Sequence, residues 1–149
     1  FINDEMIDRL TNRPTLDHAS NLGAMISYSI AKEIGVDSYI YDPVSVDESG
    51  DIAKVSGLKG LDRVCLTHTL NTRAMAIKYA KQHNKNYKDL NLIVAHLGGG
   101  ISLNVHEKGK MVDFVSDEEG PFSPERAGTA IKNVSRFMLL RKIYLQRND

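Results

Sequence analysis

The chain has 149 residues, enough for one globular domain or for parts of two, and too few for most complete two-domain enzymes. Its 19 Lys and Arg residues balance its 19 Asp and Glu residues, so it lacks the basic surplus of a nucleic-acid-binding domain, and no apolar run approaches the ~20 residues that span a bilayer. It starts at Phe1 and has one cysteine, Cys65, so we expect a segment of a cytoplasmic protein without disulfides.

Apolar residues at helical spacing predict two helices in the first part of the chain. A short one lies within residues 1–10 and ends before Pro14. A longer one runs from Ser20, its predicted N-cap, to Ile34, and Gly35 ends it. Its apolar residues recur at steps of three and four: Leu22, Met25, Ile26, Ile30 and Ile34. A short strand is then predicted at residues 38–41, before Asp42 and Pro43.

The middle of the chain is predicted to hold loops and one further helix. Residues 44–65 mix small, polar and apolar residues around three glycines, which indicates loops with a short helical turn. A helix is predicted from Thr67 to His83, with an inward face formed by Leu70, Ala74, Ile77 and Ala80. Residues 84–89 form a polar connector.

An antiparallel meander is the clearest feature of the sequence. Residues 90–96 predict a buried strand, residues 101–106 alternate apolar and polar, and residues 111–115 predict a third strand. Gly98–Gly100 link the first two strands, and residues 107–110 form a hairpin turn. The glycines lead from strand to strand, unlike a Rossmann turn, which leads from strand to helix.

The triple glycine is the sharpest candidate for a binding site. Three consecutive glycines cost conformational entropy, and they allow the backbone N–H groups to approach phosphate oxygens closely. His96 and Ser102 flank the turn and add polar groups. The alternative is a bulged hairpin that binds nothing.

Other polar residues are candidates for binding or catalysis, and each also has a purely structural explanation. His68 and Asn71 lie one turn apart at a helix start, and His18 and Asn21 precede the first long helix; local capping would explain both pairs. Asp42 follows a predicted strand, where ligands bind in open sheets, but it is also a common turn residue before proline. Arg126 could clamp a phosphate, or form a surface ion pair with Glu119 or Glu125. Cys65 is interpreted as a small buried residue rather than a nucleophile, and no set of residues has metal-ligand spacing.

The last 19 residues differ in composition from the rest. Residues 131–149 hold five basic residues and one acidic residue, a net charge of +4, so residues 1–130 carry −4. This tail also has no glycine or proline. The shift marks a boundary.

Five segments in order resemble the butyrate kinases, a branch of the acetate kinase family in the larger actin, sugar-kinase and Hsp70 ATPase fold group. The resemblance rests on residues 18–24, 39–44, 68–71, 95–102 and 120–129, and it extends over about residues 1–129. It implies an α/β chain with the ribonuclease-H-like ATPase fold. Residues 1–89 would be the C-terminal part of a first, substrate-side domain, and residues 90–130 would open a second, nucleotide-side domain. Residues 131–149 do not match and are interpreted as a frameshifted or chimeric end.

The resemblance also implies a reaction and roles for residues. Family members transfer a phosphoryl group reversibly between ATP, bound with Mg²⁺, and a short-chain carboxylate; here this would be butanoate. Catalytic roles would fall to His68, Asp42 and, on a looser alignment, Arg126. His18, Asn21 and Asn71 would bind substrate. The ATP phosphates would be held by five residues of the turn: His96, Gly98, Gly99, Gly100 and Ser102.

Family members pair as homodimers, and their nucleotide lies in a cleft between two domains, part of which lies outside this sequence. We therefore expect negligible kinase activity from the 149-residue chain alone. The alternatives are an acetate kinase or another kinase of the same fold, a non-catalytic ATPase-like structural module, and a gene remnant without function.

Overall fold

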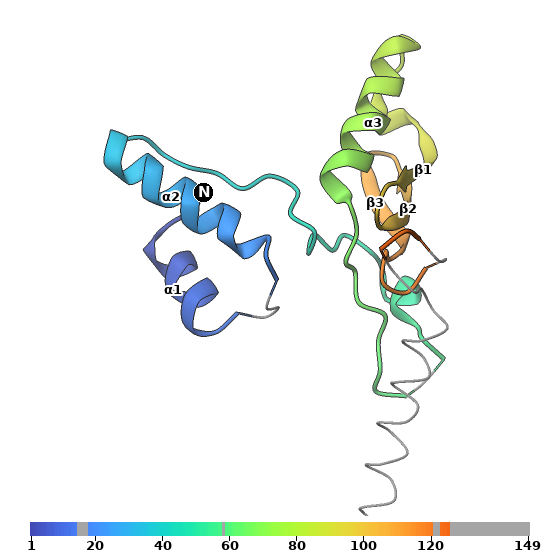
Figure 1. Ribbon diagram of the computed structural model, residues 1–149. Coiled ribbons are helices and arrows are strands. Elements are labelled where there is room, and N and C mark those ends of the chain that lie inside the picture. Colours follow the sequence, from blue (N-terminus) through green and yellow to red (C-terminus); the bar gives the residue numbers. More distant parts are fainter. Residues whose placement is uncertain (15–17, 58, 121–122, 126–149) are drawn as a thin grey trace, which may run out of the picture. The chain divides into compact units, whose positions relative to one another are not determined.

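The computed structural model describes residues 1–14, 18–57, 59–120 and 123–125, and Figure 1 shows their elements. They form two compact units, Phe1–Pro43 and a second that begins at Val44, and each is described by itself. The predicted domain boundary after residue 89 falls inside the second unit and stays a prediction. The predicted basic tail, residues 131–149, lies outside the described residues.

The first unit is a pair of helices, α1 (Asp4–Asn12) and α2 (Asn21–Ile34). The Asn3 side chain caps α1 by accepting from the Met6 N–H at 2.9 Å. The Tyr28 hydroxyl of α2 donates to the Asp4 carboxylate of α1, and Lys32 lies 3.7 Å from the same carboxylate. These contacts connect the two helices.

Helix α2 has the predicted extent, but Ser20 does not cap it and most of its apolar residues are exposed. Gly35 ends α2, as predicted, and has the left-handed conformation at φ 71°. Ser20 precedes α2 without capping it, because its hydroxyl lies 2.8 Å from His18 Nδ1 instead. The helix buries Ala24 and Ala31, whose small side chains permit close packing, and four residues of the apolar stripe are exposed: Leu22, Ile26, Ile30 and Ile34.

The strand predicted at residues 38–41 does not form. The segment is extended, and the Ser38 carbonyl accepts one backbone hydrogen bond, from the Ile2 N–H at 2.9 Å. A strand requires a ladder of such bonds. No neighbouring strand in the described part of the first unit supplies one.

The second unit is a three-stranded antiparallel sheet with a helix on one face. The strands are β1 (Asn91–Leu97), β2 (Ile101–Glu107) and β3 (Lys110–Val115), in the order β1-β2-β3. This confirms the predicted meander, although β1, predicted to be a buried strand, has only exposed and half-buried residues. Lys108 and Gly109 turn the β2–β3 hairpin with φ of 48° and 88°, the positive angles that a tight two-residue hairpin requires. Helix α3 (Thr69–Gln82) packs on β1 and β2, and short 3₁₀ turns lie at η1 (Asp51–Lys54), the predicted helical turn, and η2 (Tyr87–Asp89).

The buried face of the sheet is polar. Ser102, Asn104 and His106 of β2 are 0% exposed, beside the buried Met111 and Phe114 of β3. The His106 side chain is buried although it can carry a charge, and its Nδ1 lies 2.8 Å from the Tyr87 hydroxyl. The apolar residues of the opposite face are more accessible, and Ile93 and Leu97 are 75% and 78% exposed.

Helix α3 turns a different face to the sheet from the predicted one. Leu70 and Ala74, predicted to point inward, are exposed, and Ile77 is half-buried. Ala80 is buried as predicted, together with Thr69, Thr72 and Ala76. Small and hydroxyl-bearing residues fit a sheet face that itself presents serine, asparagine and histidine. Their burial leaves the larger Leu70 outside.

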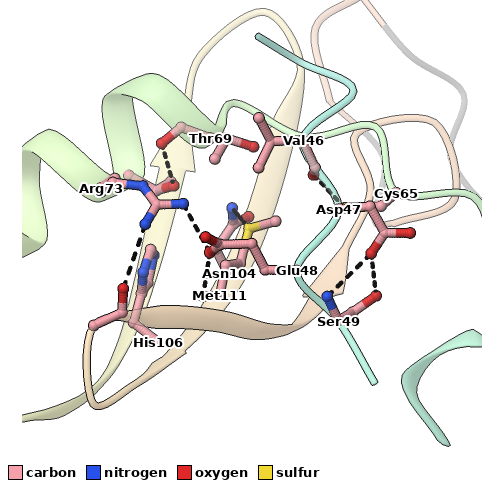
Figure 2. A network of polar contacts seen from close by, with 12 residues as sticks. Val46, Asp47, Glu48, Ser49, Cys65, Thr69, Arg73, Asn104, His106 and Met111 are labelled. Carbon is pink, nitrogen blue, oxygen red and sulfur yellow. Dashed lines mark hydrogen bonds and ion pairs between the residues drawn. The ribbon is translucent and has the colours of Figure 1, made fainter. Parts of the chain in front are cut away.

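A polar network ties Glu48, just before η1, to α3 and β3, as Figure 2 shows. The Glu48 carboxylate accepts from Arg73 Nη2 at 2.8 Å and from the Met111 N–H at 2.9 Å. Burial alone would raise the pKa of Glu48, but the Met111 N–H and the Arg73 guanidinium hold that pKa below its ordinary 4.5. The network thus connects α3 to β3 through Glu48.

Cys65 lies in the same region, in a small core with Met111 and Phe114. Its thiol donates to the Val46 carbonyl at 3.2 Å. Burial, with the nearby Asp47 charge, raises the pKa of this thiol from 9.0 to about 12. A thiol in this environment stays protonated, which agrees with its interpretation as a structural residue.

Candidate active site

Two imidazole rings lie face to face at the end of the β1–β2 hairpin where the glycine turn joins the strands. His68 directly precedes α3, and His96 is the last but one residue of β1. Their ring centroids are 3.8 Å apart and their planes differ by 6°. The sequence separates these histidines by 28 positions, and the packing of α3 on β1 brings them together.

Each ring is held at Nδ1 by a neighbouring polar side chain. Asn71, one turn into α3, places its Nδ2 2.7 Å from His96 Nδ1. Ser102, which pairs with His96 across the sheet, places its Oγ 3.0 Å from His68 Nδ1. The same oxygen accepts the His68 backbone N–H at 3.3 Å. The two partners thus fix both rings.

The glycine turn lies against these rings with no space for side chains. A Cβ atom at Gly98 would lie 2.7 Å from His96 Nε2, and one at Gly100 would lie 3.3 Å from His68 Cε1. None of Gly98–Gly100 has a positive φ. Glycine is therefore needed here for close approach of neighbouring groups, and not for an unusual backbone angle.

The turn has free donors on its backbone. The Gly98 N–H donates to the Gly100 carbonyl at 3.2 Å. Within the described part of the chain, the N–H groups of Gly99 and Gly100 have no hydrogen-bond partner. Two such groups beside two imidazoles form a surface suited to an anion.

Two carboxylates, which the sequence did not single out as site residues, also border the turn. A Cβ at Gly99 would lie 2.5 Å from the Glu125 carboxyl carbon, and one at Gly100 would lie 2.9 Å from Asp117 Oδ2. The Glu125 N–H donates to the Gly99 carbonyl at 3.0 Å, so the later loop returns to the turn. The available signal was the run of acidic residues around the Gly-Pro loop. The sequence analysis considered Glu125 only as an ion-pair partner of Arg126 and did not consider Asp117.

A site that has both hydrogen-bond donors and carboxylates suits an anion that binds as a complex with a metal cation. Mg²⁺ is usually bound by one or two carboxylates together with substrate phosphates, rather than by a cage of protein ligands. The described residues contain no group of three or more metal-ligating side chains, so no protein cage is preformed in this part of the chain. The donor set therefore fits a magnesium–phosphate complex.

The remaining predicted site residues fall elsewhere. His18 and Asn21 belong to the first unit, where the His18 carbonyl accepts the Asn21 N–H at 3.0 Å and forms the turn before α2. Asp42 also belongs to this unit and has a φ of 41°, uncommon for a residue with a side chain. Arg126 lies outside the described residues. The structure thus brings together His68, Asn71, His96, Gly98–Gly100 and Ser102, all in the second unit.

The fold formed by the described residues is a piece of the ribonuclease-H-like ATPase fold, as the sequence predicted. The chain is similar to the crystal structure of an acetate kinase from Porphyromonas gingivalis, with a TM-score of 0.70 and 20% sequence identity. The match covers 95% of this chain and 38% of that acetate kinase. No protein-family model matches the sequence. In the described residues, no helix has the length and apolar character needed to cross a membrane.

Proposed function

We propose that this chain is part of a kinase that transfers a phosphoryl group between ATP and a short-chain carboxylate. One observation carries the proposal: two stacked imidazoles and two unpartnered backbone N–H groups meet at the glycine turn. The similarity to an acetate kinase fold supports it independently. We propose butanoate as the substrate because the glycine triplet and the His68–Asn71 segment resemble the butyrate kinases more closely than the acetate kinases.

The chemistry requires electrostatic help rather than a strong base. A short-chain carboxylic acid resembles a Glu side chain, whose pKa is about 4.3, so it is already ionised at neutral pH. The barrier is the repulsion between this anion and the phosphoryl group, and the need to align them. In our proposal, the N–H groups of Gly99 and Gly100 bind phosphate oxygens, and His68 stabilises the charge of the transferring group.

We further propose that Asp117 and Glu125 face the Mg²⁺ that accompanies ATP. The cation supplies charge neutralisation at the phosphates. Without it, two carboxylates at the turn would repel a nucleotide. Asp42, His18, Asn21 and Arg126 remain proposed as catalytic and substrate-binding residues on the resemblance described above.

Binding can be tested on this chain directly. Mg²⁺–ATP is titrated into the ¹⁵N-labelled protein, and backbone and imidazole signals are followed. We expect saturable shifts at Gly98–Gly100, His68 and His96, and none at Gly57 and Gly60, which are distant in sequence and have open space around them. Shifts spread evenly over the chain, or none at the turn, would contradict the proposed phosphate site.

Substrate choice requires a protein that includes this segment and is active. Acyl phosphate is trapped with hydroxylamine, and kcat/KM is compared for butanoate and acetate. The two extra methylenes of butanoate predict a preference of at least about tenfold. His68→Ala should lower kcat by about 10²–10³, the cost of losing one transition-state donor. A preference for acetate would favour the second candidate, an acetate kinase, which the structural similarity supports. Activity insensitive to His68→Ala would contradict the proposed role of that residue.

We also propose that the protein is cytoplasmic and pairs as a homodimer. ATP and a buried, protonated Cys65 suit the cytoplasm. Light scattering on the active protein tests the dimer, and a monomeric mass would contradict it.

A further inference from the structure

The polar side chains beside the two imidazoles can determine which ring nitrogen carries the proton. A neutral imidazole has one N–H donor and one bare acceptor nitrogen, and the hydrogen bond at one nitrogen decides the state of the other. Only a ring with its proton on Nε2 can donate from the edge away from its Nδ1 partner. The identity of that partner therefore decides what each ring can offer to a ligand.

His96 is bonded to the amide nitrogen of Asn71. Asn71 Nδ2 lies 2.7 Å from His96 Nδ1. An amide nitrogen always donates, so His96 Nδ1 must be the bare acceptor. The proton of a neutral His96 then lies on Nε2, the atom that approaches within 2.7 Å of a Cβ built at Gly98. The donor of His96 thus lies beside the glycine turn.

His68 reaches the same state by another route. Ser102 Oγ is fully buried and already accepts the His68 backbone N–H at 3.3 Å. Its single hydroxyl proton would be costly to leave unbonded, and the acceptor within reach is His68 Nδ1 at 3.0 Å. The hydroxyl therefore donates, and the proton of a neutral His68 also lies on Nε2.

We propose that Asn71 and Ser102 are positioning residues that lock both stacked imidazoles in the Nε2–H tautomer, a role that builds on the phosphoryl-transfer function proposed above. Both rings then present a donor edge without having to be protonated, which avoids two positive charges 3.8 Å apart. The two side chains act through the histidines, and the phosphoryl group is recognised by the rings and the turn. This assigns Asn71 a different role from direct substrate binding, and Ser102 a different role from direct phosphate binding.

The ring nitrogens report the tautomer directly. The complete 149-residue chain is labelled with ¹⁵N-histidine and studied without ligand at about pH 8.5, about two units above the ordinary imidazole pKa. We expect His68 and His96 each to show a protonated Nε2 and a bare, downfield-shifted Nδ1. Signals are assigned by replacing each of the five histidines with glutamine in turn. A proton found on Nδ1 of either ring overturns the assignment for that ring.

Asn71→Asp tests the cause. A carboxylate can only accept, so this variant should move the His96 proton to Nδ1 and invert the pattern of its two nitrogen signals. Gln82→Glu makes the same amide-to-acid change on an exposed position of α3 and should leave His96 unchanged. Asn71 is exposed, so the variant should fold, and circular dichroism checks that it does. An unaltered His96 pattern in Asn71→Asp overturns the proposal.

Ser102→Ala provides a second, independent change. It removes the donor to His68 and should give a mixture of His68 tautomers, with His96 unchanged. A His68 pattern identical to that of the unaltered chain overturns the role of Ser102. None of these measurements includes a nucleotide. A chain with the expected tautomers that fails to bind Mg²⁺–ATP would therefore contradict the proposed function and leave this inference standing.

Discussion

Three consecutive glycines occupy the turn because neighbouring groups already fill the space of their side chains. None of Gly98, Gly99 and Gly100 has a positive φ, yet a Cβ on each would come within 3.0 Å of His96, Glu125 or Asp117. At the scale of single residues, the site therefore depends on how closely neighbouring side chains approach these glycines. The same distances predict the effect of adding a methyl group at each glycine.

Gly98→Ala should displace the His96 ring and separate the stacked imidazoles. The added methyl group would lie 2.7 Å from His96 Nε2, and such overpacking costs about 1–3 kcal/mol. We expect altered ring signals for both histidines and faster hydrogen exchange in β1 and β2. The measurement is residue-resolved NMR.

Gly23→Ala is the matched control. Gly23 lies inside α2, and nothing lies within 4 Å of a Cβ built on it. Alanine there should stabilise the helix by about 0.5–1 kcal/mol and slow exchange in α2. Equal effects of the two substitutions would contradict the close approach at Gly98.

Helix α3 positions half of the site. It buries a different face from the predicted one, on which Leu70 and Ala74 were expected to point inward. Its small and hydroxyl-bearing residues contact the polar face of the sheet, and its largest apolar residues are turned outward. This rotation also places His68 and Asn71 beside His96. At the scale of elements, the orientation of one helix decides whether the site assembles.

The orientation of α3 can be tested by making the same substitution, alanine to aspartate, at two positions of the helix. Ala76 is 1% exposed and Ala74 is exposed. Ala76→Asp buries an unpaired carboxylate and should cost about 3 kcal/mol or more, whereas Ala74→Asp should cost less than about 1 kcal/mol. Urea unfolding followed by circular dichroism measures both. If Ala74→Asp proves the more damaging, the originally predicted face is the buried one.

The Glu48 network should make the second unit sensitive to acid. The pKa of Glu48 is lowered from 4.5 in the folded chain, so its contribution to stability is complete above about 4.5 and is lost as the pH falls through the lower folded pKa. Glu48→Gln should reduce that loss of stability on acidification. Glu107→Gln, at an exposed position of β2, is the control. The experiment is thermal unfolding at pH 7 and at pH 3–4, and identical pH profiles for the unaltered chain and Glu48→Gln would contradict the role of the network.

The chain as a whole matches 38% of the length of the acetate kinase it resembles. Phosphoryl transfer requires the acceptor, the nucleotide and the catalytic groups to be held in line together. In our proposal, the described site forms one wall of such an arrangement, with its donors at the glycine turn. Binding of phosphates at this wall is therefore a separate question from turnover.

The purified 149-residue chain should form no acyl phosphate above background from Mg²⁺–ATP and butanoate. The hydroxylamine assay measures this, with an intact acetate kinase and acetate as the positive control. Product formation that disappears in the His68→Ala variant would contradict the prediction. Product that persists in that variant would indicate a contaminating kinase.

The sequence determined the local features of this protein, because periodicity and turn chemistry depend on neighbouring residues. The three strands, the Lys108–Gly109 turn, the left-handed Gly35 and the glycine turn were all predictable in this way. The strand at residues 38–41 was not, because a strand requires a partner that its own residues do not encode.

Tertiary structure alone decided which faces are buried and which side chains meet. The sheet buries Ser102, Asn104 and His106, the reverse of what hydrophobicity favours, and each has a polar partner outside the sheet. Ser102 Oγ accepts from the His68 N–H, Asn104 Nδ2 donates to Thr67 Oγ1, and His106 Nδ1 lies 2.8 Å from the Tyr87 hydroxyl. The stacking of His68 on His96 and the approach of Asp117 and Glu125 to the turn join residues that are far apart along the chain. Those contacts depend on the packing of α3 against the sheet and on the return of the loop, so the spacing of these residues along the chain could not predict which of them meet.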